Sequence, residues 1–133
     1  MHKILLAYDG GEPSRRALEQ TIELAKSFGA TVGVISVVPS RTTTRAADPW
    51  DDRTVHAEAL LEARRLLRDA GIEAELLEPS GHPAMVIERI ADERGYDTIV
   101  MGSRGLGTVT RAIQGSVSEH VVTHARATVI VAR

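Results

Sequence analysis

Short apolar runs alternate along the chain with longer stretches whose apolar positions recur at helical spacing. Each run has the length of a strand, and Thr31–Val38 is almost continuous in β-branched residues, as is typical of a strand covered on both faces. The predicted strands are Lys3–Tyr8, Thr31–Val38, Ala74–Leu77, Thr98–Met101 and Thr128–Ala132. Strands that alternate with helices predict βαβ units and a parallel sheet.

Four helices are predicted between these strands. The first begins near Ser14 and ends at Gly29, a glycine in the position of a C-cap; its apolar stripe consists of Leu18, Ile22, Ala25 and Phe28. The other three run from about Arg53 to Ala70, from His82-Pro83 to Gly95 with Val86, Ile87, Ile90 and Ala91 directed inward, and from Gly115 to His124. Residues 39–52 have no period and are predicted to form a loop.

Five strands and four helices in strict alternation predict an α/β fold. We expect a Rossmann-like, five-stranded parallel sheet with helices on both faces and right-handed crossovers. The chain has 133 residues and shows no internal repeat, so residues 1–133 are expected to form a single domain.

Composition narrows the classes of function. Sixteen basic and eighteen acidic residues give a net charge of −2, which does not favour binding to nucleic acid or to a membrane surface. The absence of cysteine excludes disulfides and thiolate metal sites. The longest uncharged run, Ser27 to Ser40, is too short to span a bilayer. The first strand begins at Lys3, which leaves no room for a signal peptide, and we therefore expect a cytoplasmic protein.

The candidate chemistry follows the fourth predicted strand. Gly102 and Gly105 leave the end of a buried strand, where open α/β sheets bind ligands, and they let main-chain N–H groups approach a bulky anion. Arg104 adds a positive charge. Gly115 and Ser116 then open the last predicted helix, whose free amides and positive dipole end attract phosphate. These residues alone also fit a glycine-rich turn without function.

The spacing Gly102-x-x-Gly105, nine residues, then Gly115-Ser116 resembles the nucleotide-binding motif of the universal stress protein family. The likeness extends over nearly the whole chain, including Asp9 after the first strand, Gly81-x-Pro83 before the third helix, and the C-terminal residues 115–133. Family members that keep this motif bind ATP, whereas those that lack it do not. The resemblance therefore implies ATP as the ligand, with a divalent Mg or Mn ion on the phosphate oxygens left open.

The resemblance also implies a strand order of 3-2-1-4-5, in which Asp9 and Gly102 face each other across a crevice. The residues that it places around the adenosine are Ala7, Tyr8, Asp9, Val37, Met101 and Gly102. Asp9 would meet the base or ribose, Ala7 and Tyr8 would line the base, and Val37 would offer main-chain groups to the adenine edge. Met101 and Gly102 would lie along the ribose. Around the phosphates it places Arg104, Gly105, Gly115, Ser116 and Val117.

Two further features need an interpretation. His120 and His124 lie one helical turn apart, and Ser116 precedes His120 by the same spacing, a pattern that fits either a metal pair or a serine–histidine nucleophile. No further metal ligand and no orienting carboxylate stands out, so neither metal ligands nor catalytic residues are predicted. The last strand, in contrast, is an apolar edge without a guarding charge. Both this edge and the family resemblance indicate a homodimer through the fifth strand.

The favoured hypothesis is a universal stress protein that acts as an ATP-dependent regulatory switch in stress response, with an unknown client protein and little or no turnover. No catalytic base positioned for phosphoryl transfer is evident in the sequence. A weak ATPase or another ATP-using enzyme is the second hypothesis, and a module that only binds a partner protein is the third.

Overall fold

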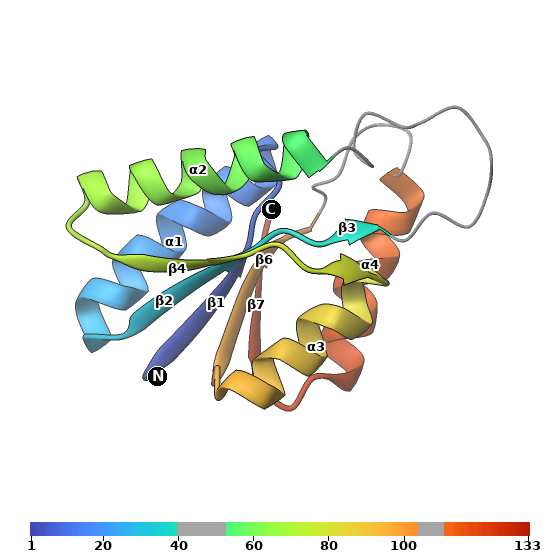
Figure 1. Cartoon of the computed structure of the whole chain (residues 1–133). Coiled ribbons are helices and arrows are strands. Elements are labelled where there is room, and N and C mark those ends of the chain that lie inside the picture. The colour runs from blue at the N-terminus through green and yellow to red at the C-terminus, as the bar shows by residue number, and fades with distance from the viewer. Residues whose placement is uncertain (40–52, 104–110) are drawn as a thin grey trace.

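A computed structural model describes residues 1–39, 53–103 and 111–133. Five parallel strands form the main sheet: β1 (Lys3–Ala7), β2 (Thr31–Ile35), β4 (Ala74–Leu77), β6 (Thr98–Gly102) and β7 (Thr128–Ala132). Their order in space is β4-β2-β1-β6-β7 (Figure 1). Counted along the chain this is the order 3-2-1-4-5, so the α/β class and the parallel five-stranded sheet are confirmed.

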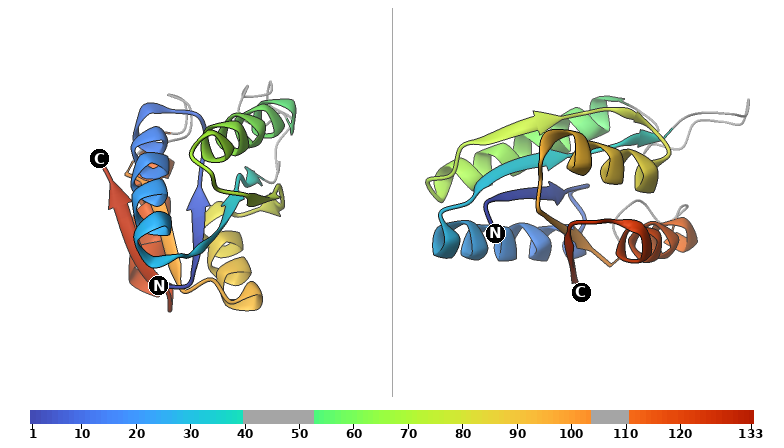
Figure 2. Two further views of the ribbon diagram at one scale, coloured as in Figure 1. Left: turned by 90° about the vertical axis from the view of Figure 1, so that its left-hand side faces the viewer. Right: turned by 90° about the horizontal axis from the view of Figure 1, so that it is seen from below.

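Helices cover both faces of this sheet, as a parallel sheet requires. Within the described residues they are α1 (Glu12–Phe28), α2 (Arg53–Asp69), α3 (Pro83–Arg94) and α4 (Arg111–His124). Helices α1 and α2 lie on one face, and α3 and α4 lie on the other (Figures 1 and 2). None of the described helices combines the length and the apolar character needed to cross a membrane.

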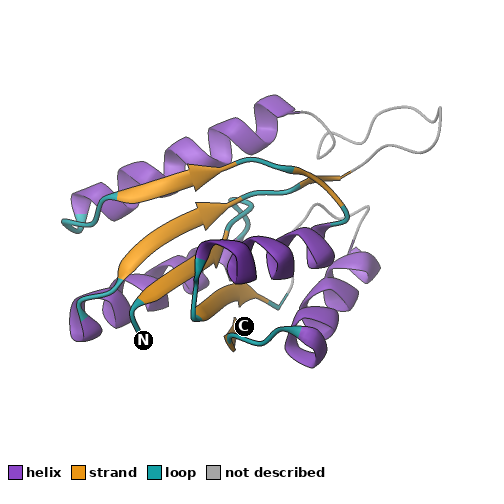
Figure 3. Cartoon of the chain, turned by 60° about the horizontal axis from the view of Figure 1, so that its bottom comes forward, coloured by secondary structure: helices purple, strands orange, loops and turns teal. Residues whose placement is uncertain are grey.

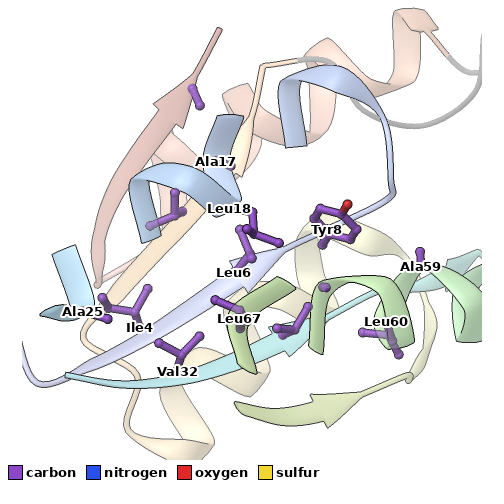
Figure 4. Close-up of a cluster of buried hydrophobic side chains, with 14 residues drawn as sticks. Ile4, Leu6, Tyr8, Ala17, Leu18, Ala25, Val32, Ala59, Leu60 and Leu67 are labelled. Carbon is purple, nitrogen blue, oxygen red and sulfur yellow. The ribbon is translucent and has the colours of Figure 1, made fainter. Parts of the chain in front are cut away.

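The core consists of two apolar clusters separated by the sheet. Because neighbouring strand residues point to opposite faces, Ile4 and Leu6 of β1 pack toward α1 and α2, whereas Leu5 packs toward α3 and α4. Ile4, Leu5 and Leu6 have no exposed surface. Figure 4 shows the first cluster, in which Leu6 lies beside Ala17 and Leu18 of α1. β1 is therefore the strand through which both halves of the core are joined.

The helix ends follow the sequence signals. Gly29 and Gly95 take left-handed φ angles of 65° and 75°, and each donates its N–H to a carbonyl of the last turn, Ala25 and Ala91. Phe28, which was expected in the apolar stripe of α1, is 57% exposed. It belongs to the last turn, next to the C-cap, and no partner from the sheet covers it there.

The largest differences from the predicted boundaries are at the end of β2 and the start of α4; the ends of β1, β6 and α2 differ by one residue. β2 ends at Ile35 rather than Val38, and the chain continues as β3 (Val38–Pro39), which pairs with β5 (Ser80–Gly81) in a second, two-stranded sheet (Figure 3). Helix α4 begins at Arg111, four residues before the expected start, since nothing in 111–114 breaks a helix. The predicted loop 39–52 lies outside the described residues from position 40 onward.

Gly33, in the middle of β2, is required by its neighbour Tyr96. A Cβ atom at position 33 would lie 2.7 Å from Cζ of Tyr96 and closer still to its hydroxyl oxygen. The ring cannot easily move away, because Tyr96 is 4% exposed and its hydroxyl donates a short hydrogen bond to Glu75 on β4. The tyrosine, two residues before β6, therefore extends across the glycine to β4 at the edge of the sheet.

We predict that Gly33→Ala lowers the free energy of unfolding by about 1–3 kcal/mol, because the added methyl group overpacks the core against Tyr96. Urea denaturation measures this effect. In a Tyr96→Ala background the same substitution should lose most of its effect, since the ring is gone. An equal loss in both backgrounds would show that Tyr96 is not the obstacle.

Candidate functional site

The strand order reverses next to β1. From β1 the chain goes first to β2 and β4 on one side, and later to β6 and β7 on the other. At such a switch point the loops after neighbouring strands leave in opposite directions, and the carboxyl ends of the strands border a crevice. Two predicted site residues, Asp9 after β1 and Gly102 at the end of β6, stand at this place.

Main-chain groups from both neighbouring strands face the end of β1. Ile35 accepts a hydrogen bond from the N–H of Tyr8, whereas Ser36 and Val38 donate to Leu77 and Pro79 on the opposite side. Since alternate residues of a strand point to alternate edges, the main chain of Val37 is directed back toward β1, beyond its last residue. In β6, the N–H of Ser103 donates to Ala132 of β7, and by the same rule the main chain of Gly102 faces β1.

Asp9 is held at this point by the start of α1. Its Oδ1 accepts hydrogen bonds from the N–H of Gly11 and from the hydroxyl of Ser14, each at 2.7 Å. The bond to Gly11 is an Asx-turn, whereas the N-cap of α1 is Gly11, without a side-chain cap. No hydrogen bond within the described residues occupies Oδ2 of Asp9. One carboxylate oxygen thus fixes the side chain of Asp9 against the start of α1.

Burial raises the pKa of Asp9 above its ordinary value, although the hydrogen bonds from Ser14 and Gly11 and the nearby imidazole of His56 act in the opposite direction. A carboxylate that costs free energy to keep charged is common where a protein uses it for binding. His56 itself is fully buried and its Nδ1 lies 2.6 Å from Oγ of Ser36.

Gly102 brings the end of β6 against the start of α1. A Cβ atom at Gly102 would lie 2.8 Å from the carbonyl carbon of Pro13 and 2.9 Å from the N atom of Ser14. Only a glycine allows this approach, because the obstacle is main chain. Ser14 therefore touches both predicted site residues, Asp9 through its hydroxyl and Gly102 through its main chain.

Tyr8 is placed differently from the expectation that it lines the base. Its ring is 2% exposed and packs in the cluster under α1 and α2 (Figure 4). Its hydroxyl donates a short hydrogen bond to Glu62. Burial and the Glu62 carboxylate raise the pKa of Tyr8 to about 12. Ala7, one residue earlier, lies on the other face, partly buried. Only the main chain of Tyr8 is left to meet a ligand.

The remaining predicted residues divide into two groups. Met101 and Val117 are 5% and 7% exposed, and their side chains pack in the cluster under α3 and α4. Arg104 and Gly105 lie outside the described residues, as does the side chain of Ser116. The main chain of Gly115 and Ser116 lies inside α4, so the expectation that they open the helix is wrong. In a helix that begins at Arg111 the free amides belong to its first turn.

A side chain missed in the sequence lies beside the two histidines. Oε1 of Glu88 on α3 is 3.2 Å from Nδ1 of His120 on α4. The ligand atoms of Glu88, His120 and His124 all lie within 4.8 Å of one another. Glu88 precedes His120 by 32 residues, and only the packing of α3 against α4 brings the two together.

Comparison with known proteins identifies one family. The family model described as "Universal stress protein family" matches residues 1–133. A protein of Staphylococcus haemolyticus that is named as a universal stress protein is 32% identical over 138 aligned positions, which cover 98% of this chain and 83% of the relative.

Solved structures show the same fold. A universal stress protein from Archaeoglobus fulgidus superposes with a TM-score of 0.80 at 27% identity, over 100% of this chain and 99% of the other. A universal stress protein from the same organism, solved in complex with dAMP, gives a TM-score of 0.74 at 26% identity, over 100% and 98% of the two chains.

The pKa of Asp9 leads to a prediction for stability. Between the ordinary and the raised pKa the unfolded chain has lost the proton while the folded chain keeps it, so the wild type loses stability as pH rises through this interval. Asp9→Asn lacks this linkage and keeps an acceptor for Gly11 and Ser14. We therefore expect Asp9→Asn to be at least as stable as the wild type at pH 7, an advantage that disappears below about pH 4, the ordinary range of an aspartate. Urea unfolding at both pH values tests this.

Ser14→Ala is the matched control for Asp9→Asn. It removes the hydroxyl that lowers the pKa of Asp9, so it should destabilise the protein at pH 7 and have less effect at the acidic pH. If Asp9→Asn is instead the less stable protein at pH 7, the hydrogen bonds to the charged carboxylate outweigh its burial.

Proposed function

We propose that this chain, which belongs to the universal stress protein family, binds ATP at the carboxyl end of β1 and acts as a nucleotide-dependent regulatory switch. In this proposal the domain presents one surface to a client protein with ATP bound and another surface without it. The place of action is the cytoplasm.

The arrangement around Asp9 is the observation that carries this proposal. A carboxylate oxygen, fixed by Ser14 and Gly11 through its partner oxygen, stands at the switch point of the sheet. Ribose hydroxyls are donors and suit this acceptor. The main chain of Val37 faces the same space from the other side, and paired N–H and C=O groups match the donor and acceptor edge of adenine.

An adenine nucleotide is also favoured by a relative. The Archaeoglobus fulgidus protein in complex with dAMP shares 26% of its residues and the whole fold with this chain. Three phosphates rather than one are implied by the resemblance of Gly102-x-x-Gly105, nine residues, Gly115-Ser116 to the family motif that binds ATP. The first turn of α4, with its free amides and positive dipole end, supports binding of the phosphates, and Mg or Mn is proposed on their oxygens.

Titration calorimetry with ATP tests this function. The wild type should bind one ATP per chain, and Gly115→Val should weaken binding at least a hundredfold, because the side chain blocks the approach of the phosphates. Asp9→Asn should weaken binding by about tenfold, the value of one lost charged hydrogen bond of roughly 1.5 kcal/mol. Valine is no worse than glycine in a helix, so the melting temperature of Gly115→Val should be unchanged.

Gly115→Ala provides the graded control and should fall between the wild type and Gly115→Val. Unchanged affinity of Gly115→Val would contradict the assignment of the phosphate site. Phosphate release from ATP by the pure protein, measured in parallel, separates the proposed switch from a weak ATPase. Turnover that Asp9→Asn abolishes would favour the enzyme.

We further propose a homodimer through β7. Within the part of the chain that the structure describes, this strand pairs only with β6, and Val129 and Val131 remain partly exposed. Because the N–H groups of Thr128 and its alternate neighbours point to β6, those of Val129 and Val131 point outward. Antiparallel pairing with β7 of a second copy about a two-fold axis would satisfy these groups and cover the apolar edge.

Sedimentation velocity at tens of micromolar tests the dimer. The wild type should sediment as a dimer, and Val129→Lys with Val131→Lys should sediment as a monomer with a lower melting temperature. Val131→Pro removes one outward N–H and spares the bonds to β6, so it should weaken the dimer without the added charge. Phe28→Lys changes an exposed apolar residue elsewhere and should leave the dimer intact. A monomeric wild type would refute the proposal.

A further inference from the structure

We propose that Glu88, His120 and His124 form a binding site for a divalent transition-metal ion, with Zn²⁺ as the ion that the donors fit best. The site lies on the surface where α3 packs against α4. It goes beyond nucleotide binding and does not require a nucleotide.

The three side chains already converge without a metal. Their ligand atoms lie within 4.8 Å of one another. The rings of His120 and His124 are stacked, with centroids 4.1 Å apart and an angle of 21° between their planes. Ligands at the usual Zn–N and Zn–O distances of a tetrahedral site are about 3.3 Å apart. A small rotation of the exposed His124 side chain toward the other two ligands would narrow this difference.

His124 is held in the tautomer that a metal needs. Its Nδ1 lies 2.9 Å from the main-chain carbonyl oxygen of His120. Because a carbonyl only accepts hydrogen bonds, Nδ1 carries the proton and the lone pair is on Nε2. Metal-bound histidines are commonly oriented in this way, by donating the other ring N–H to a carbonyl or carboxylate.

The side chain of Glu88 is held in place by its partial burial. Its side chain is 17% exposed, and it follows Ile87, which is buried in the core. This burial limits its rotamers and leaves Oε1 at 3.2 Å from Nδ1 of His120. His120 is 38% exposed and His124 is exposed, so an ion can enter from solvent.

The donor set selects the class of ion. Two imidazoles and one carboxylate are typical ligands of Zn²⁺, and three protein ligands leave the fourth position to water. Mg²⁺ and Ca²⁺ prefer oxygen ligands only and should bind weakly. A third imidazole, that of His82 before α3, borders the site, with its ring centroid 6.3 Å from that of His120.

The simpler alternative to a metal site is that Glu88 and His120 only form a hydrogen bond that stabilises the packing of α3 against α4. Glu88→Gln separates the two roles, because glutamine keeps an acceptor and a donor for His120 but removes the carboxylate charge that a metal requires. Under the metal proposal Glu88→Gln melts like the metal-free wild type, yet it loses most of its affinity for zinc.

The test uses the full chain, freed of nucleotide and treated with chelator, and titrates Zn²⁺ in competition with a chromogenic indicator. We expect one Zn²⁺ per chain and a higher melting temperature with Zn²⁺ but not with Mg²⁺. Glu88→Gln, His120→Ala and His124→Ala should each weaken binding at least tenfold. His2→Ala, which removes a histidine outside the site, should keep the affinity of the wild type. The visible spectrum of bound Co²⁺ should show tetrahedral coordination.

Two results would overturn the proposal. One is a wild type that takes up no Zn²⁺ at tens of micromolar free ion. The other is binding that persists with wild-type affinity in both His120→Ala and His124→Ala. Either result is independent of ATP binding, which is measured in a separate titration without added transition metal.

Discussion

Burial of β1 on both faces is the constraint on which the rest of the molecule depends. Ile4, Leu5 and Leu6 have no exposed surface, so alternate residues must be covered from opposite sides of the sheet. The chain meets this requirement by building β2 and β4 on one flank and β6 and β7 on the other. The reversal places the carboxyl end of β1 at the switch point of the sheet, and the first charged side chain beyond it is that of Asp9. The position of the candidate site thus follows from how the core is closed.

Strands and helices with strong periodicity could be predicted from the sequence because a parallel sheet makes its strands apolar throughout. The range Ala74–Leu77 and the range Thr128–Ala132 were predicted as the structure has them. The pair β3–β5 was missed, since two residues carry no period and the pairing of Val38 with Ser80 is a tertiary contact. The start of α4 was predicted at Gly115 because glycine is common at helix boundaries. In the folded chain Gly115 lies one turn inside the helix, which begins at Arg111.

Site residues whose place depends on the order of the strands could be predicted from the sequence. Those whose role depends on the direction of the side chain could not. Asp9 and Gly102 follow from the ends of their strands. Tyr8 was expected to line the base because it stands next to Asp9 in the sequence. The alternation of strand residues instead directs its ring into the core, where its hydroxyl donates a hydrogen bond to Glu62. Glu88 has no local signal that links it to the histidines. Its role depends on two helices that meet only in the folded chain.

Because of the helical period, helix α4 presents three different faces to its surroundings. Val117 and Val121, one turn apart, pack into the core under the sheet. His120 and His124 have the same spacing but are rotated to the α3 side, where Glu88 lies. Ser118 and Val122 are rotated the other way and line an open depression with Val131 and Arg133 beside the edge strand β7. A displacement of α4 along its axis would therefore move residues of three sites together. These are the proposed phosphate site in the first turns of α4, the proposed metal site and the proposed dimer edge. This coupling is geometric, because a helix with a buried apolar stripe cannot shift one face without shifting the others.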